Sequence, residues 1–389
     1  MIEKKKQQEE IVQPDLRFKG YTEAWLPQKF SEVSDVVRGA SPRPISDAKW
    51  FSNNSDVGWL RIADVTEQNG RIHRLTQKLS VLGQQKTRIL YDPHLLLSIA
   101  ATVGKPLINY VKTGVHDGFL IFLNPKFNID FMFQQLELHK DIWRKYGQPG
   151  SQVNLNSNIV KNHKIFIPLL SEQEKISEFF KKIDSLIAKH TQKLELLKKL
   201  KKGYLQKIFS QELRFDGFHE LWRKQKLKEI ISLEFKGKAK ANMLGKESRY
   251  LETSYLNGGN FSYVSAKADT QKTDILILWD GSQAGTVYYG FSGALGTTLK
   301  AFRPKYSGDF LYHFLKQHQQ KIYTKYRTPN IPHVIKTFTN DFFVTLPYND
   351  EQERIGYFLN MCDNFISKTV KKIELLDSQK QGYLQKMFI

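Results

Sequence analysis

The chain has 389 residues, of which 40% are hydrophobic and 13% aromatic, and its formal net charge at pH 7 is +20. This composition excludes a disordered chain and allows two or three domains with hydrophobic cores, while the charge favours a polyanionic partner such as nucleic acid. A single cysteine, Cys362, excludes an intrachain disulfide framework and a cysteine-cluster metal site.

The N-terminal residues, MIEKKKQQEE, carry charges where a signal peptide needs an apolar stretch. The most apolar run of the chain, around residues 95–103, is too short to span a bilayer. We therefore predict a cytoplasmic protein with no membrane partner, in which residues 1–14 form an N-terminal extension.

A short motif, LRFKG at residues 16–20, opens a long region that we predict to be a first globular domain, residues 15–167. The loop at residues 98–105 follows an expected buried strand, and its small residues suit either a tight turn or close approach to a phosphate. Basic side chains can also be solvated surface charges. The candidates for DNA contact in this region are Arg38, Arg43, Lys86, Arg88 and Lys105.

Residues 168–210 are predicted to form a long helix. Ser171 and Glu174 have the spacing of a capping box, and apolar residues then recur in alternating steps of four and three, as in a coiled coil. His190 and Lys201 interrupt this stripe. Such polar residues either fix the register of the two helices or lie at the edge of the stripe, and we favour the edge for the lysine. A helix over 171–209 would be about 55 to 60 Å long, or about sixteen base pairs of B-DNA. The predicted pairing positions are Ile176, Phe180, Ile183, Ile187, Leu194, Leu197 and Tyr204.

A second motif, LRFDG at residues 213–217, opens a second predicted domain, residues 211–346. It contains another small-residue loop, 279–285, after an expected buried strand, for which the same two interpretations stay open. The candidates for DNA contact in this region are Lys236, Lys238, Lys267, Lys272 and Lys300.

A second long helix is predicted over residues 347–389, with Asp350 and Glu353 in the capping-box positions. Its stripe is interrupted by Thr369 and Lys380, at the same two places as in the first helix. The predicted pairing positions are Ile355, Leu359, Cys362, Ile366, Ile373, Leu376 and Tyr383.

The two helices are copies of one another. Adding 179 to the residue number aligns 168–209 with 347–388 without a gap, and 20 of the 42 positions are identical. The LRF motifs repeat at an offset of 197, so the first variable region is longer by 18 residues. We therefore predict an α+β fold with an internal pseudo-twofold repeat. Two globular α/β domains would be separated by two long antiparallel helices that form an intramolecular coiled coil, and the chain termini would be neighbours.

These motifs resemble the specificity subunit of type I restriction-modification systems. The resemblance rests on the EQEKI and EQERI helix starts, the GYLQKIF and GYLQKMF helix ends, and the LRFKGY and LRFDGF boxes. LLLSIAATVGK at 95–105 and ILILWDGSQAGTVYYG at 275–290 are similar to target-recognition domains of that family. The resemblance covers nearly the whole chain after Pro14. It implies a non-catalytic subunit that recognises a bipartite asymmetric DNA target, one half-site per domain, with a spacer set by the helices.

The resemblance also implies the partners. They are double-stranded DNA, two methyltransferase subunits and two motor-nuclease restriction subunits. It implies that S-adenosylmethionine binds to the methyltransferase subunits and that ATP and Mg²⁺ bind to the restriction subunits, while this chain binds no cofactor and no metal.

Motifs for catalysis in this chain are incomplete. Asn124-Pro125-Lys126 lacks the second proline and the aromatic residue of an adenine methyltransferase loop, and Gly104-Lys105 is followed by proline rather than by the Ser or Thr of a phosphate-binding loop. We therefore expect no catalytic residue here. Two alternatives stay open: a self-sufficient DNA-modifying enzyme, and a basic coiled-coil interaction protein that binds RNA or DNA.

Overall fold

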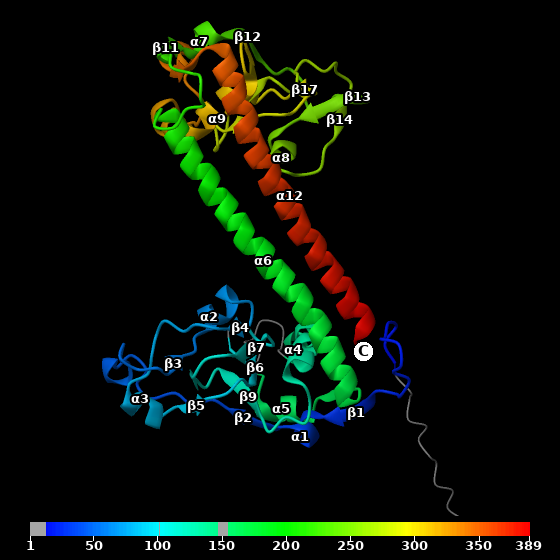
Figure 1. The fold of residues 1–389 in the computed structure, drawn as a ribbon. Helices are drawn as coiled ribbons and strands as arrows, with labels where there is room; N and C mark the ends of the chain where they lie inside the picture. The colour runs from blue at the N-terminus through cyan, green and yellow to red at the C-terminus, as the bar shows by residue number, and fades with distance from the viewer. Residues whose placement is uncertain (1–12, 101, 147–154) are drawn as a thin grey trace, which may run out of the picture. The chain divides into compact units, whose positions relative to one another are not determined.

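The computed structural model describes residues 13–100, 102–146 and 155–389, so most of the predicted N-terminal extension lies outside the described residues. The chain divides into two compact units, which we call unit 1 (Met1–Lys189 with Ile373–Ile389) and unit 2 (His190–Lys372). Because the long helices α6 (Leu170–Phe209) and α12 (Asn349–Met387) both cross this division, each unit contains part of both (Figure 1).

Unit 1 is built on a five-stranded sheet with the order β2-β9-β6-β7-β4 and a three-stranded sheet with the order β3-β8-β5. Leu95–Ser98 and Phe119–Leu123 are nearly continuous apolar runs, as expected for strands buried on both faces. The strands are β1 (Leu26–Lys29), β2 (Asp35–Arg38), β3 (Gly58–Trp59), β4 (Arg71–Ile72), β5 (Arg88–Leu90), β6 (Leu95–Ser98), β7 (Pro106–Asn109), β8 (Thr113–Val115), β9 (Phe119–Leu123) and β10 (Lys164–Ile167).

The main helix of unit 1 is α4 (Ile129–Leu138), which begins where the Asn128 side chain accepts hydrogen bonds from the backbone N–H groups of Asp130 and Phe131. Phe131 of α4 belongs to one hydrophobic core with Phe180 of α6 and with Phe388. The core therefore joins the sheet to both long helices. The other helices are α1 (Phe30–Val33), α2 (Ile62–Glu67), α3 (Val81–Gln85) and α5 (Ser157–Asn162), with 3₁₀ turns η1 (Ala48–Trp50) and η2 (Trp143–Tyr146).

Unit 2 has a four-stranded sheet with the order β12-β18-β15-β16 and a three-stranded sheet with the order β14-β13-β17. Its strands are β11 (Arg223–Lys226), β12 (Ile231–Lys236), β13 (Leu244–Leu251), β14 (Tyr263–Val264), β15 (Ile275–Leu278), β16 (Val287–Tyr288), β17 (Ala294–Leu295), β18 (Leu299–Pro304) and β19 (Phe343–Leu346). Its shorter helices are α7 (Leu227–Ile230), α8 (Thr253–Leu256), α9 (Gly308–Gln317), α10 (Gln319–Lys325) and α11 (Phe338–Asp341).

The duplication continues through the sheets, where the sequence comparison found almost no alignment. The order of strands across the larger sheet is the same in both units: β2-β9-β6-β7 in unit 1 corresponds to β12-β18-β15-β16 in unit 2. In both units an antiparallel ribbon, β1 with β10 and β11 with β19, leads into a long helix. Because buried apolar residues can replace one another at similar volume, the topology persists after sequence identity has been lost.

The difference in length between the two copies lies in one segment. Between β2 and β6 the chain runs through residues 39–94, whereas between β12 and β15 it runs through residues 237–274. These segments hold 56 and 38 residues, so their difference accounts for the 18 extra residues of the first copy. In unit 1 this segment also contributes β4 to the main sheet and Leu60, Val65 and Ile72 to the core.

The long helices begin at Leu170 and Asn349, so Ser171 and Asp350, which were predicted to cap them, lie inside the first turn rather than before it. At this turn the Gln173 side-chain amide donates to the Pro168 carbonyl at 2.8 Å, and Gln352 donates to Pro347 at the same distance. These bonds connect each helix start to the strand before it.

The contacts inside each unit confirm the predicted antiparallel helices. In unit 1 the start of α6 packs against the end of α12, with the Phe179 and Tyr383 rings 5.0 Å apart. In unit 2 the end of α6 packs against the start of α12, with the Tyr204 and Phe358 rings 5.1 Å apart. The start of each long helix therefore lies beside the end of the other, as in an antiparallel pair.

Two ion pairs accompany this packing, and they revise the interpretation of Lys201 and Lys380 as edge residues. Lys380 Nζ lies 2.7 Å from Asp184 in unit 1, and Lys201 Nζ lies 2.5 Å from Asp363 in unit 2. The duplication relates one pair to the other. Lysine and aspartate on facing helices fix the register of an antiparallel pair, because another register would separate the charges.

Each LRF motif docks against the end of a long helix. In unit 1 the Leu16 N–H donates to the Lys386 carbonyl at 2.8 Å, and in unit 2 the Leu213 N–H donates to Lys207 at 3.0 Å. The Trp25 ring packs 6.2 Å from that of Phe388. The predicted proximity of the first motif to the chain's C-terminal end is confirmed.

A pH effect in unit 2 comes from His313 on α9, which is 1% exposed. Its Nε2 lies 3.0 Å from the Asn360 side-chain oxygen and 3.9 Å from Asp363. Burial, followed by the charge of Lys201, lowers the pKa of His313 to about 4. In the unfolded chain the imidazole has its ordinary pKa near 6.5 and takes up a proton more readily than in the folded chain. The stability that the neutral, buried His313 contributes is therefore complete above pH 6.5 and is lost as the pH falls toward 4.

We therefore expect the free energy of unfolding to fall by about 1 to 2 kcal/mol between pH 7 and pH 5 because of His313. The equivalent residue in unit 1 is Gln134, which donates to Asp184 at 3.0 Å. His313→Gln should therefore fold and should lose this part of the pH dependence. Denaturant unfolding of both proteins at the two pH values measures the difference, and equal pH dependence in the two would contradict this assignment.

Candidate nucleic-acid interface

In unit 1 three connecting segments meet at one end of the five-stranded sheet. The Gly39 N–H donates to the Phe119 carbonyl at 3.0 Å, and the Ala40 N–H donates to Val115 at 2.9 Å. The Ile99 N–H donates to Gly118 at 2.9 Å. The segment after β2, the loop after β6 and the turn before β9 therefore lie side by side.

Arg38 and Arg43 converge at this end on Asp117. Arg38 Nε donates to the Asp117 carbonyl, and Arg43 donates to the Asp117 carboxylate at 2.6 Å. Partial burial opposes ionisation of Asp117, but a hydrogen bond from Ser41 and the charges of both arginines lower its pKa below the usual value. The carboxylate therefore stays ionised and orients the Arg43 guanidinium at the surface, while the Asp117 backbone carbonyl orients that of Arg38.

The other candidates for DNA contact in unit 1 lie around the same end of the five-stranded sheet. Arg88 on β5 is exposed and pairs opposite Val115, and Lys86 precedes it at the end of α3. The Lys105 carbonyl accepts from the Ser98 N–H at 2.9 Å, which places Lys105 beside the loop after β6. Residue 101 of that loop lies outside the described residues. The structure thus brings Arg38 and Arg43 together and sets the other three on neighbouring segments.

Unit 2 repeats this arrangement at the end of β12. The Gly237 N–H donates to the Leu299 carbonyl at 2.9 Å, and the Ala239 N–H donates to Leu295 at 3.0 Å. Lys236 and Lys238 are exposed on this segment, and Lys236 pairs with Asp280 at 2.8 Å. Basic side chains therefore occupy equivalent positions in two units whose sequences differ there.

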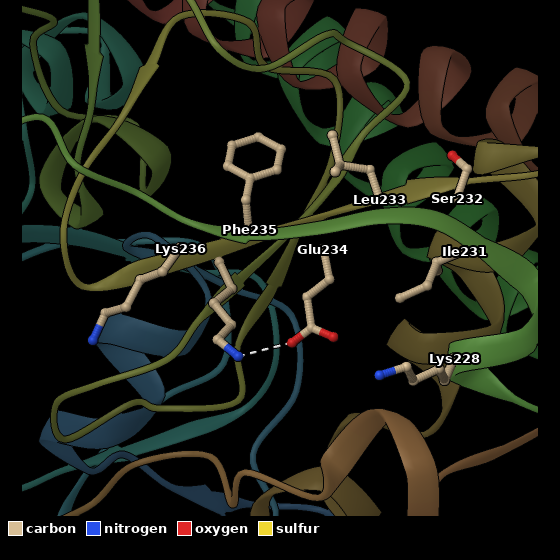
Figure 2. Close-up of a pocket in the computed structure, with 8 residues that line it drawn as sticks. Lys228, Ile231, Ser232, Leu233, Glu234, Phe235 and Lys236 are labelled. Atoms are coloured by element: carbon tan, nitrogen blue, oxygen red, sulfur yellow. Dashed lines mark hydrogen bonds and ion pairs between the residues drawn. The ribbon is translucent and has the colours of Figure 1, made fainter.

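A surface pocket of about 440 Å³ runs along β12 and brings Lys300 beside Lys236. Lys300 Nζ lies 2.8 Å from Glu234 and 3.8 Å from the centre of the Trp279 ring. Figure 2 shows Glu234 and Phe235 on opposite sides of the strand, as the pleat requires, with the Glu234 ion pair drawn as a dashed line. With three lysines and one carboxylate, the pocket suits an anionic group. Its lining residues are Lys228, Ile231, Ser232, Leu233, Glu234, Phe235, Lys236 and Lys300.

Two candidates for DNA contact in unit 2 lie away from the basic side chains around Lys236. The Lys272 carbonyl accepts from the Gly290 N–H just before β15 begins, so Lys272 lies at the opposite end of the sheet from Lys236. Lys267 lies beyond β14, next to Ala266, whose carbonyl accepts from Ser248. Charge and chain region alone could not separate these two lysines from the others.

Sequence reasoning missed Arg249. This exposed residue on β13 lies directly across from Tyr263 on β14, and its guanidinium lies 5.0 Å from the centre of the Phe261 ring. The aromatic pattern FSY at residues 261–263 was visible, but only strand pairing brings it to the arginine.

The predicted helix-pairing positions lie on the less exposed faces of α6 and α12, with one exception. Tyr383 is 37% exposed, whereas the next residue, Leu384, is fully buried. The Tyr383 ring packs edge-on against Phe179 at the margin of the helix pair, which leaves its hydroxyl group in water. Ile176, Phe180, Ile355, Leu359 and Leu376 are buried, and Ile183, Ile187, Leu194, Leu197, Tyr204, Cys362, Ile366 and Ile373 are half-buried.

Comparison with known proteins identifies the class. The family model of the type I restriction modification DNA specificity domain matches residues 23–199 and again residues 219–377. The chain therefore belongs to this family and carries two copies of its domain. The boundaries of the matches follow the duplication, since each includes one sheet region and most of one long helix.

Individual relatives agree with this assignment. The chain is 31% identical over 196 residues to the type I restriction enzyme MjaVIII specificity subunit of Methanocaldococcus jannaschii, in a match that covers 46% of this chain and 46% of that protein. The matched part is thus about half the length of that relative.

Two solved structures share the fold. One is the S subunit of a type I restriction-modification system from M. genitalium, with a TM-score of 0.71 at 16% identity over 97% of this chain and 99% of that chain. The other comes from a study of complex assembly and conformational transition of the type I R-M system, with a TM-score of 0.52 at 16% identity, covering 95% and 98%. Among the described residues, no helix is both long and apolar enough to cross a membrane.

Proposed function

We propose that this chain is the non-catalytic DNA-recognition subunit of a type I restriction-modification complex and that each unit recognises one half of a split, asymmetric target. One observation carries the proposal: the two units share a core and a basic sheet end but differ in the segment beside it, residues 39–94 in one and 237–274 in the other. Two such surfaces suit two unlike half-sites.

Bases between the half-sites would not be read. Both long helices contribute to both units, and their lengths, 40 and 39 residues, differ by one residue. We assign the spacer length to them, because a helix is the stiffest connection that a chain of this length can supply.

The same duplication supports a scaffolding role. An exposed residue that is identical in both copies, within helices that differ at 22 of 42 positions, suits a partner that binds twice. Leu196 and Leu375 are 61% and 51% exposed, although exposure of a leucine brings no stability. Two methyltransferase subunits are the proposed occupants. The exposed identical pairs include Leu196 with Leu375, Gln206 with Gln385 and Lys207 with Lys386.

The remaining partners and cofactors belong to the same proposal. Restriction subunits would join the complex, S-adenosylmethionine would bind to the methyltransferase subunits, and ATP and Mg²⁺ would bind to the restriction subunits. This chain would bind duplex DNA and supply no reacting group.

Mapping adenine methylation tests the proposal. DNA from cells that express this chain with its methyltransferase partner should carry methylation at a split motif, and replacing residues 28–166 by those of a relative should change one half of the motif only. A contiguous motif, or a change in both halves, would contradict it. Methylation by the purified chain alone would instead favour a self-sufficient enzyme, and equal binding of RNA and duplex DNA would favour a general nucleic-acid-binding protein.

A further inference from the structure

The three-stranded sheet of unit 2, β14-β13-β17, which we call the small sheet, carries an exposed aromatic cluster around Arg249. Phe261 is 50% exposed and Tyr263 is 45% exposed, and their rings lie 5.6 Å apart. The Tyr255 ring lies 6.2 Å from Phe261 and 5.6 Å from Phe291. Tyr255 and Phe291 are only partly buried but pack on the hydrophobic core beneath the sheet, so the cluster is anchored at one side and open to solvent at the other.

The arginine is held by this cluster and remains accessible. Its guanidinium lies over Phe261, and Tyr263 is its direct partner across the strands. Hydrogen bonds with Tyr263 and Tyr255 raise the pKa of Arg249. Stacking restricts the planar group without using most of its five N–H donors, and this is the state that favours bidentate hydrogen bonding to a planar acceptor.

The location of the cluster indicates its ligand. A protein subunit that binds both copies would be expected to contact features that both copies share, whereas Arg249 lies in the 237–274 segment, where the two units differ. The part of the target that differs between the units is the base sequence of each half-site. The segment itself has six lysines and arginines and four carboxylates, so its net charge is positive and it suits an anionic partner.

We infer that Arg249 is a specificity-determining residue that recognises a guanine in the half-site bound by unit 2, with Phe261 and Tyr263 orienting its guanidinium at the base edge. Arginine bidentate to guanine O6 and N7 is the commonest base-specific contact in the major groove. This inference rests on the proposed function and adds to it a residue and a base.

The test compares Arg249→Ala and Arg249→Lys with the natural chain, each expressed with its methyltransferase partner, by mapping methylated adenines. We expect one G·C position in a single half-site to become degenerate, while the other half-site and the spacer stay the same. Lysine keeps the charge but not the planar fork, so it should relax the same position to a lesser degree.

A matched control is Arg223→Ala. Arg223 is also exposed and lies over an aromatic ring, Tyr348, at 4.5 Å, but it belongs to the β11–β19 ribbon rather than to the small sheet. It should leave the motif unchanged. If Arg249→Ala removes all methylation, competition binding of the purified complex on duplexes randomised at one half-site gives the answer: discrimination at one base pair should fall about tenfold to a hundredfold.

An unchanged motif in both Arg249 variants would overturn the inference, as would a uniform loss of binding with discrimination intact, because that is the behaviour of a phosphate contact. Both outcomes leave the proposed function standing, since the natural chain would still direct methylation to a split motif. If the natural chain produces no split motif, the proposed function itself fails.

Discussion

Replacing Glu172 by glutamine should destabilise unit 1 by about 3 to 5 kcal/mol. The Glu172 carboxylate is 1% exposed and accepts two hydrogen bonds from Arg17 of the LRF motif, at 2.9 and 2.6 Å. Glutamine has nearly the same shape but no charge. The Arg17 guanidinium, 10% exposed, would remain buried without a counter-charge, and this is the costly state of a buried ion pair.

The duplication supplies an independent repeat of this experiment. Arg214 and Glu351 form the same two hydrogen bonds in unit 2, at 2.9 and 2.7 Å, so Glu351→Gln should have the same effect there. Glu174→Gln, an exposed glutamate two residues beyond Glu172, should change stability by no more than about 0.5 kcal/mol. Denaturant unfolding gives the values. Equal small effects for all three variants would show that the buried pairs do not stabilise the docking of the LRF motifs.

These pairs illustrate what the sequence could and could not predict. The helices were predictable because their apolar residues recur in a fixed period and because a second copy confirmed each position. The LRF and EQE motifs were both visible, and each recurs, but nothing in the sequence joins Arg17 to Glu172 across 155 residues. The available signal was that both copies have an arginine in the LRF motif and a glutamate at the start of the EQE motif.

The sheets were less predictable for a physical reason. Strands such as Leu95–Ser98 and Ile275–Leu278 are buried apolar runs, and such runs contain no alternation that would reveal their partners. Their order depends on contacts between distant residues. The common topology of the two units therefore became visible only in three dimensions, and with it the finding that their difference in length lies between β2 and β6 in one unit and between β12 and β15 in the other.

The candidate interface divides in the same way. Arg38, Arg43, Lys236 and Lys300 were selected by charge and lie at the same end of the sheet in their units. Lys272 was selected by the same criterion and lies at the other end, because charge carries no information about the direction of a strand. Arg249 was missed because Tyr263 belongs to another strand, β14, and Phe261 lies just before that strand.

A second substitution, Gly237→Ala, should destabilise unit 2 by about 3 kcal/mol. A Cβ atom at Gly237 would lie 2.1 Å from the Gly296 carbonyl oxygen and 2.4 Å from that of Leu295. Both atoms belong to the backbone that leads into β18, so relief requires the main chain to move. The segment after β12 passes this close because its next N–H groups bond to Leu299 and Leu295, which directs it from the main sheet into the small one.

Gly39 occupies the equivalent position in unit 1, where a Cβ atom would lie 2.1 Å from the His116 carbonyl oxygen, so Gly39→Ala should be similarly destabilising. The control is Gly382→Ala. Gly382 lies inside α12 with no atom within 4 Å of an added Cβ, and alanine there should stabilise the protein by about 0.5 to 1 kcal/mol through its higher helix propensity. Thermal unfolding distinguishes the two directions. If Gly237→Ala left the midpoint unchanged while Gly382→Ala raised it, the close passage from main sheet to small sheet would not be required, and neither would the fixed position that it gives to Lys236 and Lys238.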